Sequence, residues 1–330
     1  MLAAALAVLT VAAAWGWYAR ADLSQVGLHA PIATAAQEGA VTATWFGVSS
    51  LLFDDGETQL LVDGFISRPS LWDVLLQRPV DNDAPMIDFV LHEYGISRLA
   101  VIVPVHSHFD HAMDVGAIAN RSSASILGSE STANIARGAG VPEDQIVVAE
   151  PGEAYAFGQF TVTVLRTLHA PVGLRGEVPI PGSIDEPLEL PVPVDAWREG
   201  ESYSIVIGHP QGTTIVQGSA GYLEGALDGV RADVVMLGVG LLESLGRNYA
   251  EGYWQSLVTA TGAERVFPVH FEDFTRPFGD IVLPPTIIDD FRRTAAWLIE
   301  FRDTWDRSTD ISLPVFGRPI VLYPAPAPEA

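Results

Sequence analysis

The stretch that organises this chain is Val101-Ile-Val-Pro-Val-His106-Ser-His108-Phe-Asp110-His111. Its first five residues are apolar and mostly β-branched, which is typical of a buried strand. Its last six residues place three imidazoles and one carboxylate directly after that strand. A lone histidine is usually a satisfied core residue, but ordinary packing gives no reason to crowd four ionisable side chains at one strand end. The stretch therefore indicates a metal site.

The spacing within this stretch has a mechanical meaning. Side chains two positions apart on an extended backbone point the same way, so His106 and His108 are placed to converge on one ion. Asp110 and His111 follow as the chain turns, where they can serve an adjacent second ion. We also expect Asp110 to act in catalysis, because its carboxylate can orient a metal-bound water.

The pattern His-x-His-x-Asp-His resembles the signature of the metallo-β-lactamase superfamily. The resemblance extends to two further strands that each end in a histidine. Phe160-Thr-Val-Thr-Val-Leu-Arg-Thr-Leu leads into His169, and Arg265-Val-Phe-Pro-Val leads into His270. It implies that His169 is the third ligand of the first site, after His106 and His108. It places His270 with Asp110 and His111 at the second site.

Two further positions gain a meaning from the resemblance. Leu60-Leu-Val-Asp63-Gly matches an early strand that ends in an aspartate near the metals, so we expect Asp63 to hold a ligand by a hydrogen bond. A simple Asp-Gly turn is the alternative. At Gln217-Gly-Ser219-Ala-Gly the chain departs from the family pattern, which has a metal-bridging aspartate where Ser219 stands. This departure predicts one tightly held ion and a weak second site.

The resemblance covers about residues 41 to 280 and implies an α/β fold, the four-layer αββα sandwich of two mixed β-sheets flanked by helices. Within the superfamily, the segment Trp45-Phe-Gly-Val-Ser-Ser-Leu-Leu is most similar to the branch of sugar-phosphate lactonases and N-acylphosphatidylethanolamine phospholipase D. We expect one hydrolase domain over residues 22–323, with insertions near 65–97 and 170–201, and a disordered proline-rich tail at 324–330.

Composition narrows the classes of chemistry. The 330 residues carry 18 basic and 41 acidic side chains, a formal charge of −23, and every basic residue is arginine. So acidic a surface repels phosphate backbones, which argues against nucleic acid as a partner. Without lysine there is no Schiff-base chemistry, and without cysteine there are no thiolate ligands, cysteine nucleophiles or disulfides.

The first residues are almost wholly apolar, from Leu2 to Tyr18, with no charge before Arg20. We expect residues 1–21 to be a signal peptide or an N-terminal membrane anchor. Either one predicts a periplasmic, extracytoplasmic or membrane-anchored protein. The usual cationic start is missing, so a buried N-terminal helix remains the alternative.

Three expectations concern segments outside the motifs. The Pro-rich stretch 170–201 is expected to form a wall or lid of the substrate site through Ile180, Ile184 and Leu188, or else a plain surface loop. His92 is expected to be structural, and His209 to lie exposed in a hairpin turn. Residues 285–306 are expected to form one long helix opened by proline.

These observations predict a metal-dependent hydrolase that uses a metal-activated water on an ester, lactone or phosphodiester bond of a small, lipid-like molecule. Zinc is the expected ion, with manganese and iron(II) as alternatives, because imidazole and carboxylate ligands do not select sharply. A catalytically silent metal-binding protein is the alternative that Ser219 suggests. A nuclease of the same superfamily is disfavoured by the charge.

Overall fold

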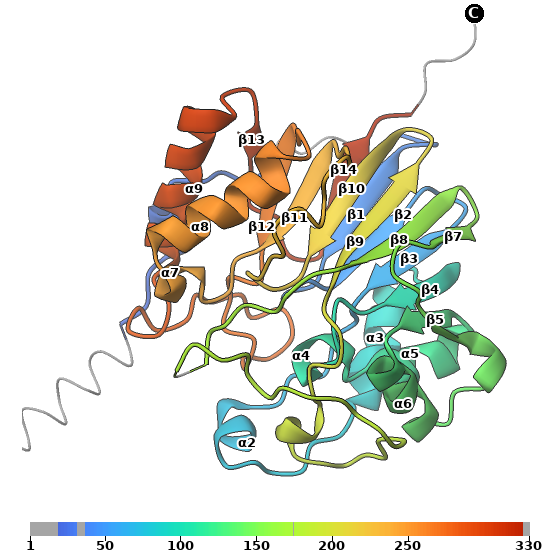
Figure 1. Cartoon of the computed structure of the whole chain (residues 1–330). Helices are drawn as coiled ribbons and strands as arrows, with labels where there is room; N and C mark the ends of the chain where they lie inside the picture. Colours follow the sequence, from blue (N-terminus) through green and yellow to red (C-terminus); the bar gives the residue numbers. More distant parts are fainter. Residues whose placement is uncertain (1–18, 32–36, 174, 326–330) are drawn as a thin grey trace, which may run out of the picture.

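The computed structural model describes residues 19–31, 37–173 and 175–325 (Figure 1). The predicted signal peptide or anchor at 1–21 and the predicted tail at 324–330 therefore lie almost wholly outside the described residues. In the part that is described, no helix is both long and apolar enough to cross a bilayer.

Two seven-stranded mixed sheets form the centre of the molecule. The first sheet has the order β14 (Pro319–Tyr323), β1 (Val41–Trp45), β2 (Leu51–Asp54), β3 (Gln59–Val62), β4 (Leu99–Val103), β5 (Ser125–Gly128) and β6 (Ile146–Val148). The second has the order β13 (Asp310–Ile311), β12 (Arg265–Val269), β11 (Val234–Gly238), β10 (Gly212–Gln217), β9 (Tyr203–His209), β8 (Phe160–Arg166) and β7 (Ala154–Phe157).

Helices cover the outer faces of both sheets (Figure 1). The first sheet is covered by α3 (Ala84–Glu93), α5 (Val115–Ser122) and α6 (Glu130–Gly138), and the second by α7 (Leu242–Leu245), α8 (Arg247–Trp254) and α9 (Phe291–Trp305). Shorter helical elements lie in the connections: η1 (Leu23–Gln25), α2 (Leu71–Leu75), α4 (Phe109–Ala112), η2 (Glu143–Gln145), η3 (Val194–Ala196) and a π-turn, η4 (Gln255–Thr259). The predicted αββα sandwich of two mixed sheets is confirmed.

Alternation along the strands of the first sheet explains why it can be covered on both faces. Leu60 and Val62 belong to the core between the sheets, whereas Leu61 packs on the helix side. In β4, Val101 and Val103 likewise face the other sheet while Ile102 faces the helices. Side chains on a strand alternate between faces, so an uninterrupted apolar run is what a doubly covered strand requires.

Strand direction brings distant parts of the chain to one edge. In the first sheet β3 and β4 are parallel. In the second, β8 and β10 are each antiparallel to β9, and β10, β11 and β12 are parallel, so β8, β10 and β12 all end on the same side. The loops that follow these strands therefore meet at one rim.

Several segments differ from their predicted structure. Helix α9 begins at Phe291, with Asp290 as its N-cap, so the prediction of a helix opened by a proline at residue 285 is wrong. Residues 284–289 form a loop instead. The prediction that His209 lies exposed is also wrong, because it ends β9 and its side chain is only 3% exposed, packed against Phe160 with Nε2 3.6 Å from Asp55 Oδ2.

Candidate metal centre

Five of the eight histidines and one aspartate gather at the rim in two groups. The first group is His106, His108 and His169, and the second is Asp110, His111 and His270. Within each group one ligand atom per residue lies within 4.8 Å of the others. The two groups adjoin, because the ring centroids of His106 and His111 are 4.0 Å apart. The structure therefore brings together all six residues that the sequence nominated.

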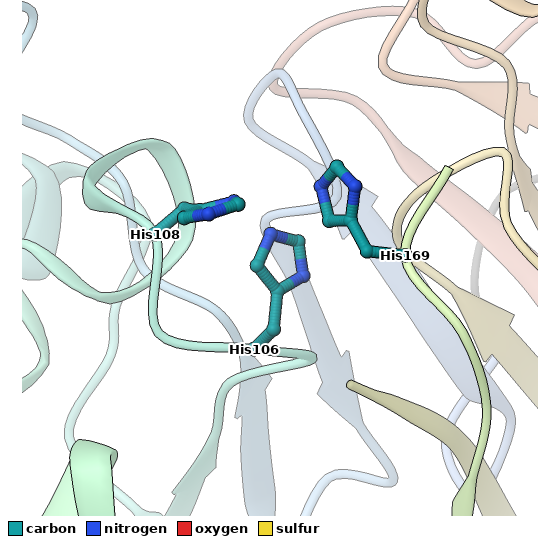
Figure 2. Close-up of side chains that lie close together, drawn as sticks. All are labelled: His106, His108 and His169. Atoms are coloured by element: carbon teal, nitrogen blue, oxygen red, sulfur yellow. The ribbon is translucent and has the colours of Figure 1, made fainter. Parts of the chain in front are cut away.

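The first group is built from the ends of two strands in different sheets. His106 and His108 lie in the loop after β4, and His169 follows β8. Their rings converge (Figure 2), with centroids 4.6 Å apart for His106 and His108 and 4.7 Å apart for His106 and His169. Nε2 of His106 is buried and has no hydrogen-bond partner among the described residues. A buried ring nitrogen without a partner fits a metal ligand, since such atoms are otherwise almost always satisfied.

The protonation of the first group also fits a metal. Burial, reinforced by the neighbouring imidazoles, holds the pKa of His106 well below its usual range. Burial likewise lowers the pKa of His108, and lowers that of His169 to about 3. Neutral imidazole is the form that binds metal. Three such rings at one point match a three-histidine site for a transition-metal ion.

The second group centres on Asp110. Its Oδ2 lies 3.3 Å from Nε2 of His270 and 3.5 Å from Nε2 of His111. Burial alone would raise the pKa of Asp110, but His111, His270 and His108 together lower it, so the group is a carboxylate. His111 and Asp110 lie on α4, the single helical turn for which His108 is the N-cap residue.

Asp63 orients one ring of the second group from behind. Its Oδ2 accepts a hydrogen bond from Nδ1 of His111 at 2.8 Å and another from the hydroxyl of Ser49 at 2.6 Å. Its Oδ1 accepts the backbone N–H of Val105 at 2.9 Å. Nε2 of His111 is thereby directed towards Asp110. The predicted hydrogen bond from Asp63 to a candidate ligand is present, and such bonds fix the ring and tautomer of a metal-binding histidine.

Ser219 lines the same cavity as His169 and His270, and its hydroxyl is engaged by backbone groups. Its hydroxyl oxygen accepts hydrogen bonds from the backbone N–H groups of Ala170 and Gly221, both at 3.3 Å. Its backbone carbonyl accepts the hydroxyl of Tyr253 at 3.2 Å. Ser219 therefore ties the loop after β10 to the residue beside His169, and it supplies no negative charge to the rim.

Two buried carboxylates near the rim had no predicted role. Oε1 of Glu272 accepts the backbone N–H of Val48 at 2.5 Å, while the carbonyl of Val48 accepts the N–H of His270 at 2.9 Å. Glu272 thus clamps the loop that carries His270. The sequence offered one sign of this role, because Glu272 lies two residues after His270, the histidine that follows β12.

The second of these carboxylates is Asp289, which is 3% exposed and lines the same cavity as His270. One of its oxygens accepts the N–H of Leu241 at 2.8 Å, and the other has no partner among the described residues. Burial raises the pKa of Asp289 to about 6. It was missed because the sequence around it was interpreted as part of a long helix.

A cavity of about 320 Å³ opens over the two groups. His108, Asp110, His169 and His270 all reach it, and most of its remaining wall is apolar, including Leu71, Val172, Pro179, Ile180, Phe274 and Ile288. Of the predicted lid residues only Ile180 faces the cavity. Ile184 is buried in the hydrophobic core between the first sheet and its helices, and Leu188 packs against the same core. The backbone N–H of Leu188 donates to the carbonyl of Asn134 on α6. For these two side chains the prediction of substrate contact is wrong.

The arrangement of the sheets and the residues at the rim point to the same fold. Two mixed sheets lie face to face with helices outside, and strand ends from both sheets deliver one aspartate and five histidines in the order of the His-x-His-x-Asp-His pattern and its two later motifs. The chain has the metallo-β-lactamase fold.

Curated relatives of this metallo-β-lactamase-fold chain are distant. No family model matches the sequence. A UPF0173 metal-dependent hydrolase of Anaeromyxobacter sp. strain K is 27% identical over 139 residues, which are 41% of this chain and 45% of that protein. The chain thus matches less than half the length of this relative. A UPF0173 metal-dependent hydrolase of Pyrobaculum islandicum is 23% identical over 238 residues, or 70% of this chain and 84% of that protein.

Solved structures share the metallo-β-lactamase fold of this chain over most of its length. Isothiocyanate hydrolase from Delia radicum gut bacteria superposes with a TM-score of 0.54 at 14% identity, covering 86% of this chain and 99% of that one. CmlA, a diiron β-hydroxylase from Streptomyces venezuelae, gives a TM-score of 0.53 at 14% identity, covering 87% of this chain and 55% of that one. At such identities the likeness concerns the fold alone.

Proposed function

We propose that this chain is a metal-dependent hydrolase of an ester, lactone or phosphodiester bond. The observation that carries the proposal is the pair of adjoining His/Asp groups beneath an open, largely apolar cavity. Relatives that bear the name metal-dependent hydrolase support it. A site whose only purpose is structural has no need of a cavity that reaches its ligands.

The first group is the place for the ion that activity requires. His106, His108 and His169 would hold it through neutral imidazoles. A divalent ion bound there supplies Lewis acidity, which makes water more acidic and stabilises negative charge on the substrate oxygen. We expect zinc, with manganese or iron(II) as alternatives, since three imidazoles do not discriminate sharply among these ions.

Asp110 is the proposed catalytic residue. It is an ionised carboxylate at the cavity wall, so its oxygens can orient the attacking water and accept a proton. His111 and His270 flank Oδ2 and keep the carboxylate charged. Asp63 in turn holds His111 by a hydrogen bond at 2.8 Å, so this partner of Asp110 is fixed in place.

A second ion would bind the second group weakly. Asp110, His111 and His270 offer one negative charge, and Ser219 adds none where the superfamily pattern has a bridging aspartate. A site with fewer anionic ligands holds a divalent cation less tightly. Weak occupancy also leaves Asp110 free for proton transfer.

The cavity indicates the kind of substrate. Its volume suits a small molecule, and its walls of leucine, valine, proline and phenylalanine suit an apolar chain or ring next to the scissile bond. We therefore propose a lipid-like substrate and no nucleic acid. The apolar residues 2–18 support a location outside the cytoplasm or at a membrane.

A silent metal-binding protein is the second candidate, and the observation that favours it is Ser219, which removes a charge from the rim. It predicts bound metal without turnover.

The test is an activity panel on the full chain. Protein stripped with a chelator is reloaded with zinc, manganese or iron(II) and assayed on esters, lactones and phosphodiesters. We expect turnover that depends on metal, that falls by about 10²-fold or more in Asp110→Asn, and that is unchanged in His92→Ala, which alters an exposed histidine of α3. Full metal content without turnover on any substrate would favour the silent protein.

A further inference from the structure

We propose that the mouth of the metal-site cavity docks on a lipid bilayer through exposed apolar side chains that surround it. The proposal deepens the proposed function, because it states where the substrate is met, and it rests on observations that do not involve the metal ligands.

The first observation is helix α2. Leu71 lines the cavity, and this short helix together with its C-cap residue Leu76 exposes three large apolar side chains. Trp72 is 63% exposed, and Leu75 and Leu76 are 57% and 56% exposed. Its polar residue Asp73 is engaged in the N-terminal cap with Ser70. A five-residue helix that turns its large apolar side chains to solvent lacks the partner that would bury them.

The second observation lies elsewhere along the same mouth. Ile288 lines the cavity and is 42% exposed, and its neighbour Ile287 is 69% exposed. Leu168, which precedes the ligand His169, is 54% exposed. Six of the ten exposed large apolar side chains in the described residues thus belong to segments that border this one cavity. A random scatter over the surface would not gather them there.

The third observation is where the N-terminal segment joins the described structure. The carbonyl of Ala19 accepts the N–H of Thr286 at 2.9 Å, beside Ile287. Arg20 lines the cavity, donates to the carbonyl of Leu283 at 2.6 Å and pairs with Asp273 at 2.8 Å. Ala19 and Arg20, the first residues that the structure describes after the apolar sequence 2–18, therefore lie at the rim of the cavity (the chain from residue 19 is the blue trace in Figure 1).

A bilayer suits this rim better than a second copy of the chain. A net charge of −23 makes two copies repel each other, whereas a zwitterionic lipid surface carries no such penalty. An exposed tryptophan with leucines and isoleucines is the composition of interfacial contacts, in which apolar side chains enter the boundary between headgroups and acyl chains. Docked this way, the cavity would open towards the lipid, and an amphiphilic substrate would enter without crossing water.

Site-directed labelling tests the proposal in the metal-loaded full chain. The sequence has no cysteine, so Trp72→Cys, Ile287→Cys and Trp305→Cys each give a single attachment point for a polarity-sensitive fluorophore. Trp305 is the matched control, because it is a tryptophan of similar exposure, 50%, at the far end of α9. Metal content of each labelled protein shows that it has folded.

With phosphatidylcholine vesicles, we expect labels at 72 and 287 to shift to the blue and to be quenched by brominated acyl chains, while the label at 305 does neither. If labels at 72 and 287 respond no more than the label at 305, the proposal is wrong. It is also wrong if they are already shifted without vesicles, since a second copy or the chain itself would then cover the rim. The readout needs no turnover, so a failed hydrolase proposal would leave it intact.

Discussion

At the scale of single residues, charge decides what the rim can hold. The first group contributes only neutral rings, and the second contributes one carboxylate, Asp110. Ser219 stands where the superfamily pattern has a metal-bridging aspartate, and its hydroxyl accepts the N–H groups of Ala170 and Gly221. An attraction of several kcal/mol between a divalent ion and one partly buried charge is thereby lost.

Ser219→Asp should therefore raise the metal bound at equilibrium from about one to about two ions per chain. Metal titration of chelator-treated protein measures this directly. Two tightly held ions in the unmodified protein would show that another group replaces the missing carboxylate.

Asp289 gives a prediction on stability, because its buried carboxyl has a pKa raised from the usual value to about 6. A raised pKa favours the protonated form in the fold, so the resulting stabilisation is present at low pH and is lost as the pH rises through 6. At about pH 8 the buried charge costs at most about 3 kcal/mol, from a shift of about two pKa units. Asp289→Asn should remove this cost.

Denaturant unfolding of the metal-free unmodified chain and of Asp289→Asn, at about pH 8 and about pH 4.5, measures the free-energy cost of the buried Asp289 charge. We expect the variant to be more stable than the unmodified chain at the higher pH, with the gain shrinking at the lower. An equal difference at both pH values would mean that folding does not raise the pKa of Asp289.

At the scale of elements, the site depends on how closely strand ends from the two sheets approach. Gly218 follows β10 and lies against Val105 and Ser49, the two residues whose N–H and hydroxyl hold Asp63. A Cβ at Gly218 would overlap Val105 and lie 2.9 Å from the Ser49 hydroxyl. The absence of a side chain here lets the second sheet reach the partners of Asp63.

Gly218→Ala should accordingly destabilise the fold by roughly 1–3 kcal/mol, as overpacking does, and weaken metal binding as well. Gly208→Ala in the neighbouring strand β9 is the control, because a Cβ there meets no atom closer than 3.8 Å. Unfolding curves and metal content of both variants provide the comparison. If Gly218→Ala changed neither the free energy of unfolding nor the metal content, the two sheets would have room for a methyl group at this contact.

Elements also show why part of the structure could be predicted. An apolar run followed by a histidine is visible in the sequence itself. The sequence therefore predicts β4, β8 and β12 together with the candidate ligands that follow them. Strand β14 pairs with β1, although most of the chain separates the two strands in sequence. Nothing in the local sequence of β14 predicts this pairing. His209 looked like a turn residue because its burial comes from Asp55 and Phe160, which only the folded sheets bring near. Asp289 was missed because residues 285–306 were predicted to form one helix, whereas α9 begins only at Phe291.

At the scale of the whole molecule, one face combines the metal groups, the apolar cavity and the attachment of the N-terminal segment. The six candidate ligands come from positions 106 to 270, so the site exists only when both sheets are folded and packed together. A strongly acidic molecule also draws cations towards such a site. We expect the two groups at this rim to bind metal with different affinities, because only the first offers three neutral imidazoles to one ion.

Metal titration of the chelator-stripped full chain with two matched variants tests that claim most directly. His169→Ala and His270→Ala each remove one imidazole from the rim, the first from the three-histidine group and the second from the Asp110 group. We predict that His169→Ala loses the single tightly bound zinc, whereas His270→Ala keeps it. Tight zinc retained in His169→Ala, or lost in His270→Ala with the fold intact, would contradict the account.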